Sequence, residues 1–264
     1  MQLIAIQIIV LALLGLSESM IGREWKQSKQ LIVTRRTRNL TLTVISHAVL
    51  PPFSVALSVP LRHLLHANLI AQLPIMVGIV TTVLILDLAG YWLHRMNHLI
   101  PLLWRYHQIH HMDNDIDITT GVRVHFLESL TQQAVLLAIV TTLGVPTLYF
   151  TVFLITLFVT SVFHHTNVRL PGHVEKWVSR VINTPKVHVI HHHARHADNN
   201  SNYGNVFSWW DRIFGTFNRA QHTPSDRLGV SYADDTGAAA LTLLPFKPRQ
   251  PWDTQASQRQ ASRS

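Results

Sequence analysis

Residues 69–93, LIAQLPIMVGIVTTVLILDLAGYWL, form the strongest candidate membrane span of the chain. About 20 apolar residues in a helix cross the ~30 Å hydrocarbon core of a bilayer, so this stretch predicts a membrane span. The next five residues, HRMNH, place His94 and His98 one helical turn apart on the same face. The fold is therefore expected to combine a membrane helix with imidazoles at its end.

The composition agrees with a membrane protein. Of the 264 residues, 47% are hydrophobic and 14% are charged, whereas soluble domains average about a quarter charged. The formal net charge of +8 favours anionic lipid over nucleic acid as a partner, because the chain is so apolar. The absence of cysteine excludes disulfides, thiolate metal sites and cysteine-ligated iron–sulfur clusters.

Three further stretches are apolar enough to enter the bilayer. Residues 3–16 predict a retained span, because the basic residues follow it, whereas those of a signal peptide precede the apolar run. Residues 40–60 are apolar but broken by Pro51 and Pro52. Residues 130–163 predict a helical hairpin that turns at 144–146, Gly-Val-Pro, with arms at the short end for full spans. The chain is thus expected to be all-α and multi-pass, with about four to five membrane segments.

Basic residues set the expected orientation. Those at 23–38 predict a cytoplasmic loop by the positive-inside rule, with the N-terminus outside. Residues 94–125 and 164–264 then both emerge in the cytoplasm. The dense histidine clusters would lie together there, in a helical cap on the membrane anchor.

Histidine spacing points to metal. HQIHH at 107–111 and HVIHH at 188–192 repeat the i, i+3, i+4 pattern, which puts each triplet on one helix face, aimed at a common point. With His94 and His98 there are eight such residues, which favours more than one ion, since a metal takes four to six ligands. One pair alone is as often structural, and histidine-rich tracts also form loose metal-binding tails. Repetition at predicted membrane exits favours a built site.

Carboxylates near these motifs have two interpretations. They are either partners of the imidazole N–H groups or solvated loop residues, and the second is favoured for Asp115 and Asp117. The other candidates are Asp113, Glu128 and Asp198.

Several stretches together resemble the fatty acid hydroxylase / sterol desaturase superfamily of membrane di-metal oxygenases. The resemblance covers roughly residues 80–217. It is carried by DLAGYWLHRMNH (87–98), LWRYHQIHHMD (103–113), GVRVHFLE (121–128), HHTNV (164–168), TPKVHVIHH (184–192) and NYGNVFSWWDRIFGT (202–216).

The resemblance implies a cytoplasmic di-iron site that uses O2 and two electrons to hydroxylate, or alternatively desaturate, a lipid C–H bond. It implies no catalytic residue beyond the metal ligands, and it selects His165 over His164. Zinc is expected to replace iron in some purified samples, because divalent affinities favour it. The implied ligands are His94, His98, His107, His110, His111, His125, His165, His188, His191 and His192.

His193 departs from the family pattern and is expected to face solvent; the alternative is a local pair with His196. The chain carries no GxGxxG motif or haem signature, so electrons are expected from a separate reductase or carrier. Three parts follow: 1–79 with the first membrane segments and basic loop, 80–217 as the catalytic part with its membrane hairpin, and 218–264 as an extension with a disordered tail.

Two other classes of protein remain open. A metal transporter or metal-sensing membrane protein predicts ionisable residues near the middle of the spans. The long apolar stretches carry few such residues: Asp87 lies near the end of one, and His47 lies near Pro51. A catalytically inactive relative would be expected to lack intact histidine motifs. No residue distinguishes sterol, fatty acyl, carotenoid or alkyl-ether substrates.

Overall fold

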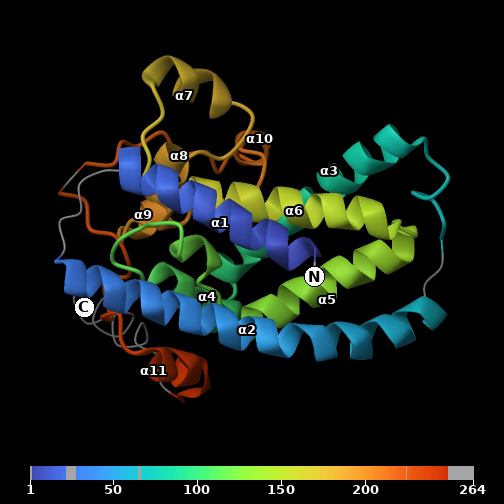
Figure 1. Ribbon diagram of the computed structural model, residues 1–264, viewed down its shortest axis with the longest axis horizontal. Coiled ribbons are helices and arrows are strands. Elements are labelled where there is room, and N and C mark those ends of the chain that lie inside the picture. The colour runs from blue at the N-terminus through green and yellow to red at the C-terminus, as the bar shows by residue number, and fades with distance from the viewer. Residues whose placement is uncertain (1, 22–27, 65–66, 224, 249–264) are drawn as a thin grey trace, which may run out of the picture.

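The computed structural model describes residues 2–21, 28–64, 67–223 and 225–248. Within these ranges the chain is helical and holds no strand, only two isolated β-bridges. The all-α prediction is therefore confirmed. Long helices run across the molecule, while short helices and loops gather at one end (Figure 1).

Four helices of the described chain are long and apolar enough to cross a membrane. α2 (Lys29–Leu64) packs mainly on α5, and α3 (Ile75–Leu99) packs mainly on α6. A fifth helix, α1 (Gln2–Ile21), holds the shorter apolar segment Ala5–Met20 and contacts α6. These helices confirm the prediction of four to five membrane-capable segments.

α2 corrects two expectations about the N-terminal region. The helix is continuous through Pro51, Pro52 and Pro60, although each proline removes a backbone donor. Helices in membranes tolerate such breaks in the hydrogen-bond ladder. The predicted basic loop is also helical from Lys29 onward, and its residues 22–27 lie outside the described ranges.

The hairpin predicted at 144–146 is present between α5 (Phe126–Leu143) and α6 (Thr147–His164). Gly144 ends α5 with a φ of 64°, in the left-handed region. The amide of Val145 donates to the Val140 carbonyl at 2.9 Å. A Cβ on Gly144 would lie 2.8 Å from the Ala67 carbonyl oxygen, so both backbone conformation and space require glycine here.

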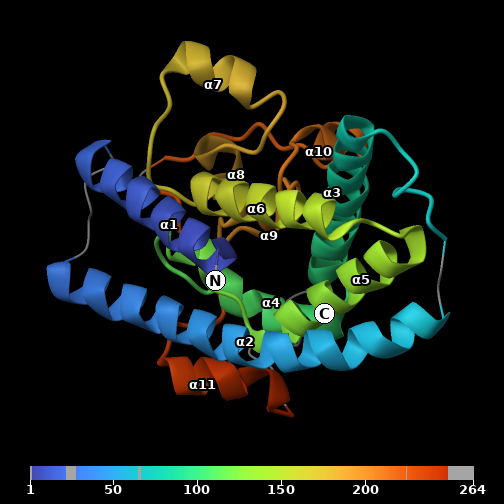
Figure 2. The same ribbon diagram turned by 45° about the vertical axis from the view of Figure 1, so that its right-hand side comes forward.

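The histidine-rich cap consists of residues 94–125 and 164–248. It contains α4 (Pro101–His111), α7 (Gly172–Val178), α8 (Pro185–His191), α9 (His196–Asn199), α10 (Trp209–Ile213) and α11 (Ala238–Leu243), with the short 3-10 helices η1 (Thr120–Val122) and η2 (Leu244–Phe246). α3 and α6 both run toward this cap and end in it, while α11 lies against α2 on the opposite side from α7 (Figure 2).

Asp87 joins α3 to the cap. Its buried carboxylate accepts hydrogen bonds from the amides of Val206 and Phe207, at 3.0 and 3.1 Å, and from the Trp210 indole at 2.8 Å. An acid placed among apolar neighbours needs such donors. These bonds fix the loop before α10 on the side of α3.

Ion pairs hold the start of α2 against the loop that follows α4. Arg35 donates to Asp113 at 3.0 Å and to Asp117, and Arg36 donates to Asp117 at 2.8 Å. Asp117 is fully buried, so its expected solvation is wrong. Burial alone would raise the pKa of Asp117, but the charge of Arg35 and the hydrogen bonds from Thr119 and Arg36 together outweigh it and lower that pKa.

The described part of the C-terminal extension packs against α2 and against the rest of the cap. Asp235 accepts from the buried Arg123 guanidinium at 2.8 and 3.0 Å and also pairs with Arg38. Leu241 packs in a buried core with Leu42. The predicted disordered tail falls largely on residues 249–264, which lie outside the described ranges.

Candidate metal centre

Nine of the ten expected ligands gather in two clusters. Each cluster is defined by ligand atoms that all lie within 4.8 Å of one another. The five-histidine cluster contains His94, His98, His107, His111 and His191. The four-histidine cluster contains His110, His165, His188 and His192. All but His98 are buried.

Each histidine triplet divides between the two clusters. In α4, His107 and His111 join the five-histidine cluster and His110 joins the other. At the end of α8 the division is reversed, because His188 and His192 join the four-histidine cluster and His191 joins the other. The expectation that each triplet converges on one point is therefore wrong. The i, i+4 pair serves one cluster, and the i+3 side chain is turned far enough round the helix to serve the second.

The four-histidine cluster has the spacing of a metal site. His165 Nε2 lies 3.0 Å from His188 Nε2, 3.2 Å from His110 Nε2 and 3.3 Å from His192 Nε2. The His188 and His192 Nε2 atoms are 3.2 Å apart. Tetrahedral ligands at metal–nitrogen distances of about 2.0–2.1 Å are separated by about 3.3–3.4 Å. A single ion fits among these nitrogens.

The five-histidine cluster contains nitrogens that lack any protein partner. His107 Nε2 lies 3.1 Å from His98 Nε2 and 3.2 Å from His111 Nε2. The Nε2 atoms of His94 and His191 are buried and have no hydrogen-bond partner. Two orphaned acceptors in a buried site are costly unless something binds them, and a cation satisfies both at once.

Hydrogen bonds at Nδ1 prepare these rings for metal. Because carbonyl and carboxylate oxygens only accept, Nδ1 carries the proton and Nε2 keeps its lone pair for the ion. In the five-histidine cluster the Nδ1 acceptors are Tyr203 O at 2.8 Å for His94, Glu128 Oε1 at 2.7 Å for His107 and Ser201 O at 2.6 Å for His191. In the four-histidine cluster they are Arg123 O at 3.1 Å for His110 and Ser161 O at 2.7 Å for His165.

The environment keeps six of the clustered rings neutral. Burial, reinforced by neighbouring imidazoles, lowers the pKa well below the usual histidine value in His110, His111, His188, His191 and His192. Burial also lowers the pKa of His165, to about 4. Neutral imidazole is the form that binds metal, so these rings are ready to coordinate at neutral pH.

His125 is the expected ligand that lies outside both clusters. Its Nδ1 accepts from the Leu127 amide at 3.2 Å, which caps the start of α5, and its Nε2 donates to the Thr242 carbonyl at 3.0 Å. Both ring nitrogens are therefore already bonded within the protein, and the structure places His125 apart from the other nine expected ligands. His164 also lies outside the clusters and packs its ring 4.1 Å from that of His188.

His193 is not solvent-facing as expected. Its side chain is 2% exposed, and its ring lies between Asp198 and His222 rather than beside the two clusters. His222 comes from the C-terminal extension, which sequence reasoning treated as separate from the histidine motifs. A contact across 29 residues of loops and two short helices leaves no periodic signal in the sequence.

Several residues that support the clusters carried no metal-binding signal of their own. The amide nitrogen of Asn199 lies 3.0 Å from His111 Nδ1, and that of Asn183 lies 3.3 Å from His188 Nδ1. Tyr203 and Ser201 contribute only backbone carbonyls, a role that any residue type can fill. Glu128 alone was anticipated, as one of two interpretations.

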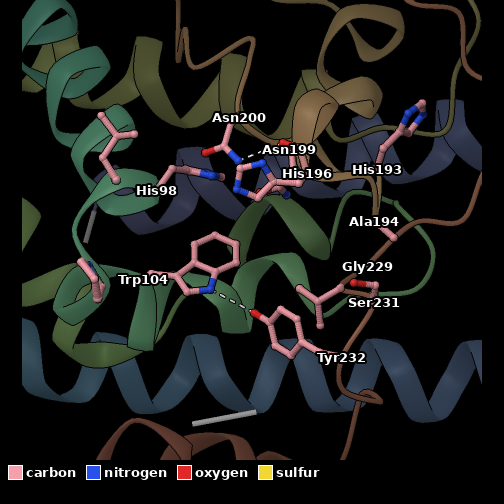
Figure 3. Close-up of a pocket in the computed structure, with 13 residues that line it drawn as sticks. His98, Trp104, His193, Ala194, His196, Asn199, Asn200, Gly229, Ser231 and Tyr232 are labelled. Carbon is pink, nitrogen blue, oxygen red and sulfur yellow. Dashed lines mark hydrogen bonds between the residues drawn. The ribbon is translucent and has the colours of Figure 1, made fainter. Parts of the chain in front are cut away.

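A cavity of about 360 Å³ adjoins the five-histidine cluster through His98. Its wall includes Leu99, Trp104, Asn199 and Tyr232. The Trp104 indole donates to the Tyr232 hydroxyl at 3.0 Å, across the lower side of the cavity in Figure 3. The cavity offers space for a small part of a larger molecule next to the metal centre.

Comparison with known proteins places this architecture in a family. The model of the fatty acid hydroxylase family matches residues 79–216, which contain all nine clustered histidines. The chain therefore belongs to the fatty acid hydroxylase family. No solved structure matches the chain.

The curated relatives of the chain are named as enzymes that modify lipids. The chain is 28% identical over 177 residues to the ornithine lipid hydroxylase OlsE of Rhizobium tropici, which covers 66% of this chain and 52% of that protein. It is 32% identical over 132 residues to the alkylglycerol monooxygenase of Homo sapiens, covering 50% of this chain and 28% of that protein. The Caenorhabditis elegans alkylglycerol monooxygenase is 28% identical over 154 residues, covering 57% and 29%. The chain thus spans about half, or less, of these relatives.

Proposed function

We propose that this chain is a membrane-bound hydroxylase of a lipid C–H bond and that each histidine cluster holds one iron ion. The observation that carries the proposal is the division of nine imidazoles into two adjoining sets with ligand spacing. Rings of His111 and His192, one from each cluster, stack 4.6 Å apart between centroids, so the two ions would be close neighbours. The names of the relatives support a polar lipid as the substrate class.

Iron bound in these clusters would supply the O2 chemistry, with electrons from a separate donor. The protein's own part is to bind and to orient. Backbone carbonyls hold the rings of His94, His165 and His191 in fixed tautomers. Glu128 adds one negative charge through His107, which partly balances cations otherwise surrounded by neutral ligands.

The position of the site suits a lipid chain. α3 and α6 are both membrane-capable; His94 and His98 lie in the last two turns of α3, and His165 follows the end of α6. A lipid held in the bilayer can therefore reach the clusters from the apolar side. The cavity beside His98 offers space for the segment that carries the reacting C–H bond.

The few ionisable groups of the spans support an enzyme over a metal transporter. Asp87 is the acid of α3, and its carboxylate accepts hydrogen bonds from three donors within residues 206–210. It serves to attach the cap. A transport route would instead need ligands near the middle of the spans.

Lipid analysis of cells tests the activity. Cells that express the chain should accumulate a polar lipid gaining one oxygen atom, and His192→Ala should abolish that product, because it removes a ligand of the four-histidine cluster. His173→Ala changes an exposed histidine of α7 and should leave the product in place. Loss of two hydrogens in place of oxygen gain would indicate desaturation, and an unchanged lipid profile would overturn the proposal.

A further inference from the structure

A third group of potential metal ligands lies apart from the two clusters. His193, His222 and Asp226 offer ligand atoms that all lie within 4.8 Å of one another. We call this group the extension cluster. His193 Nε2 and His222 Nδ1 are 3.0 Å apart, close to the separations within the four-histidine cluster. His193 is one of the residues that line the cavity beside His98, and in Figure 3 its ring extends away from Trp104 and Tyr232.

Asp198 holds His193 in the orientation of a metal ligand. Its Oδ2 lies 2.9 Å from His193 Nδ1 and also accepts from Arg195 Nε at 2.7 Å, while its Oδ1 accepts from Asn218 at 2.9 Å. A carboxylate held by these donors stays ionised and accepts the Nδ1 proton. His193 Nε2 then directs its lone pair toward His222, as in the carboxylate–histidine–metal arrangement of many metal sites.

The remaining ligands are held by the backbone around them. Asp226 Oδ2 accepts from the amide and hydroxyl of Thr223, at 2.6 and 2.8 Å, which fixes the carboxylate. The Ala194 amide donates to the Arg227 carbonyl at 2.8 Å, and the Gly229 amide donates to the His192 carbonyl at 3.1 Å. The segment that carries His222 and Asp226 is therefore already aligned with the end of α8.

We propose that the extension cluster binds one divalent cation of the zinc class, with water completing its coordination. Two imidazoles and a carboxylate are ligands that Zn²⁺ accepts at three protein positions. The ion would fasten the C-terminal extension to the residues that follow His192. His193 lies within the match to the family, whereas His222 and Asp226 lie beyond residue 216, where that match ends, so two of the three ligands come from the extension.

Metal content separates this site from the buried clusters. The full-length protein is purified without a polyhistidine tag, loaded with Zn²⁺, freed of excess metal and measured for zinc per chain. His222→Ala and Asp226→Asn should each bind one ion fewer than the unchanged protein. His173→Ala, the matched control on an exposed histidine, should bind as many as the unchanged protein.

Hydrogen exchange provides a second measurement that does not depend on comparing stoichiometries. Zn²⁺ should slow amide exchange in residues 217–229 of the unchanged protein and have no such effect in Asp226→Asn. Equal zinc content in all variants, or equal exchange with and without Zn²⁺, would overturn the proposal and leave a histidine–histidine hydrogen bond. Neither measurement depends on lipid conversion. If the hydroxylase proposal failed, an ion that requires His222 would therefore still be detected.

Discussion

At the scale of residues, His192 and His193 show how one step along the chain separates two environments. His192 Nε2 faces the four-histidine cluster, whereas His193 faces Asp198 and His222. Successive residues of a helix point about 100° apart, so the sequence could predict that His193 leaves the cluster. It could not predict burial, because the covering residues come from an extension with no regular pattern.

Glu128 provides a test of the support around the five-histidine cluster. Its carboxylate accepts from His107 Nδ1 at 2.7 Å, so Glu128→Ala should weaken metal binding by about 10–100-fold, the usual cost of losing such a partner. Glu128→Gln keeps an accepting oxygen but loses the charge. The metal affinity of this variant should lie between those of the unchanged protein and Glu128→Ala. Metal titration of the purified variants measures this order, and equal affinity in all three proteins would contradict it.

At the scale of elements, spans and the hairpin were predictable because their signals are local. A run of apolar residues and a Gly-Val-Pro turn can each be recognised from neighbouring residues, without knowledge of distant contacts. The start of α2 was missed for the opposite reason. Its arginines read as a cytoplasmic loop, yet Arg35 is buried against Asp113 and Asp117, about 80 positions away along the chain.

The hairpin turn depends on Gly144. Gly144→Ala forces a side chain into the left-handed region and toward the Ala67 carbonyl, 2.8 Å from the new Cβ. The variant should lose at least about 1–2 kcal/mol of stability. Gly172→Ala is the matched control, since its Cβ would meet nothing within 4 Å. Thermal unfolding in detergent should show a lower Tm for the first variant alone; equal Tm values would refute this account of the turn.

The ion pair at the start of α2 should make stability depend on pH. Asp117→Asn should cost about 1–3 kcal/mol, because Arg35 loses one charged partner and keeps Asp113. Arg35 lowers the folded-state pKa of Asp117 from its usual 3.8, so the unfolded chain takes up the proton first. The carboxylate's contribution is then complete above about pH 4 and lost as the pH falls through the lower folded-state value. Unfolding measured from pH 7 to pH 3 should show the two proteins converging at the acid end, and a constant gap would contradict this assignment.

At the scale of the whole molecule, helical spacing predicted eight metal-binding histidines, and the family resemblance added His125 and His165 to them. Spacing on helices predicted metal, but only assembly of α3, α4, α6 and α8 shows that each triplet divides between two clusters. The same assembly places His125 outside both clusters, with its ring nitrogens bonded to Leu127 and Thr242, although its motif matches. Motifs specify which residues a family keeps, whereas ligation depends on where the backbone carries them.

The orientation of the whole molecule in the membrane is a prediction that can be tested because the chain lacks cysteine. By the positive-inside rule, the basic residues at 23–38 predict that the histidine-rich cap lies in the cytoplasm and the 67–74 loop outside. His173 and Ala71 are both exposed, one in the cap and one in that loop, so His173→Cys and Ala71→Cys each introduce a single thiol. A membrane-impermeant maleimide should label Ala71→Cys in intact cells and His173→Cys only after permeabilisation. The reverse pattern would place the metal centre outside and would require an electron donor on that side.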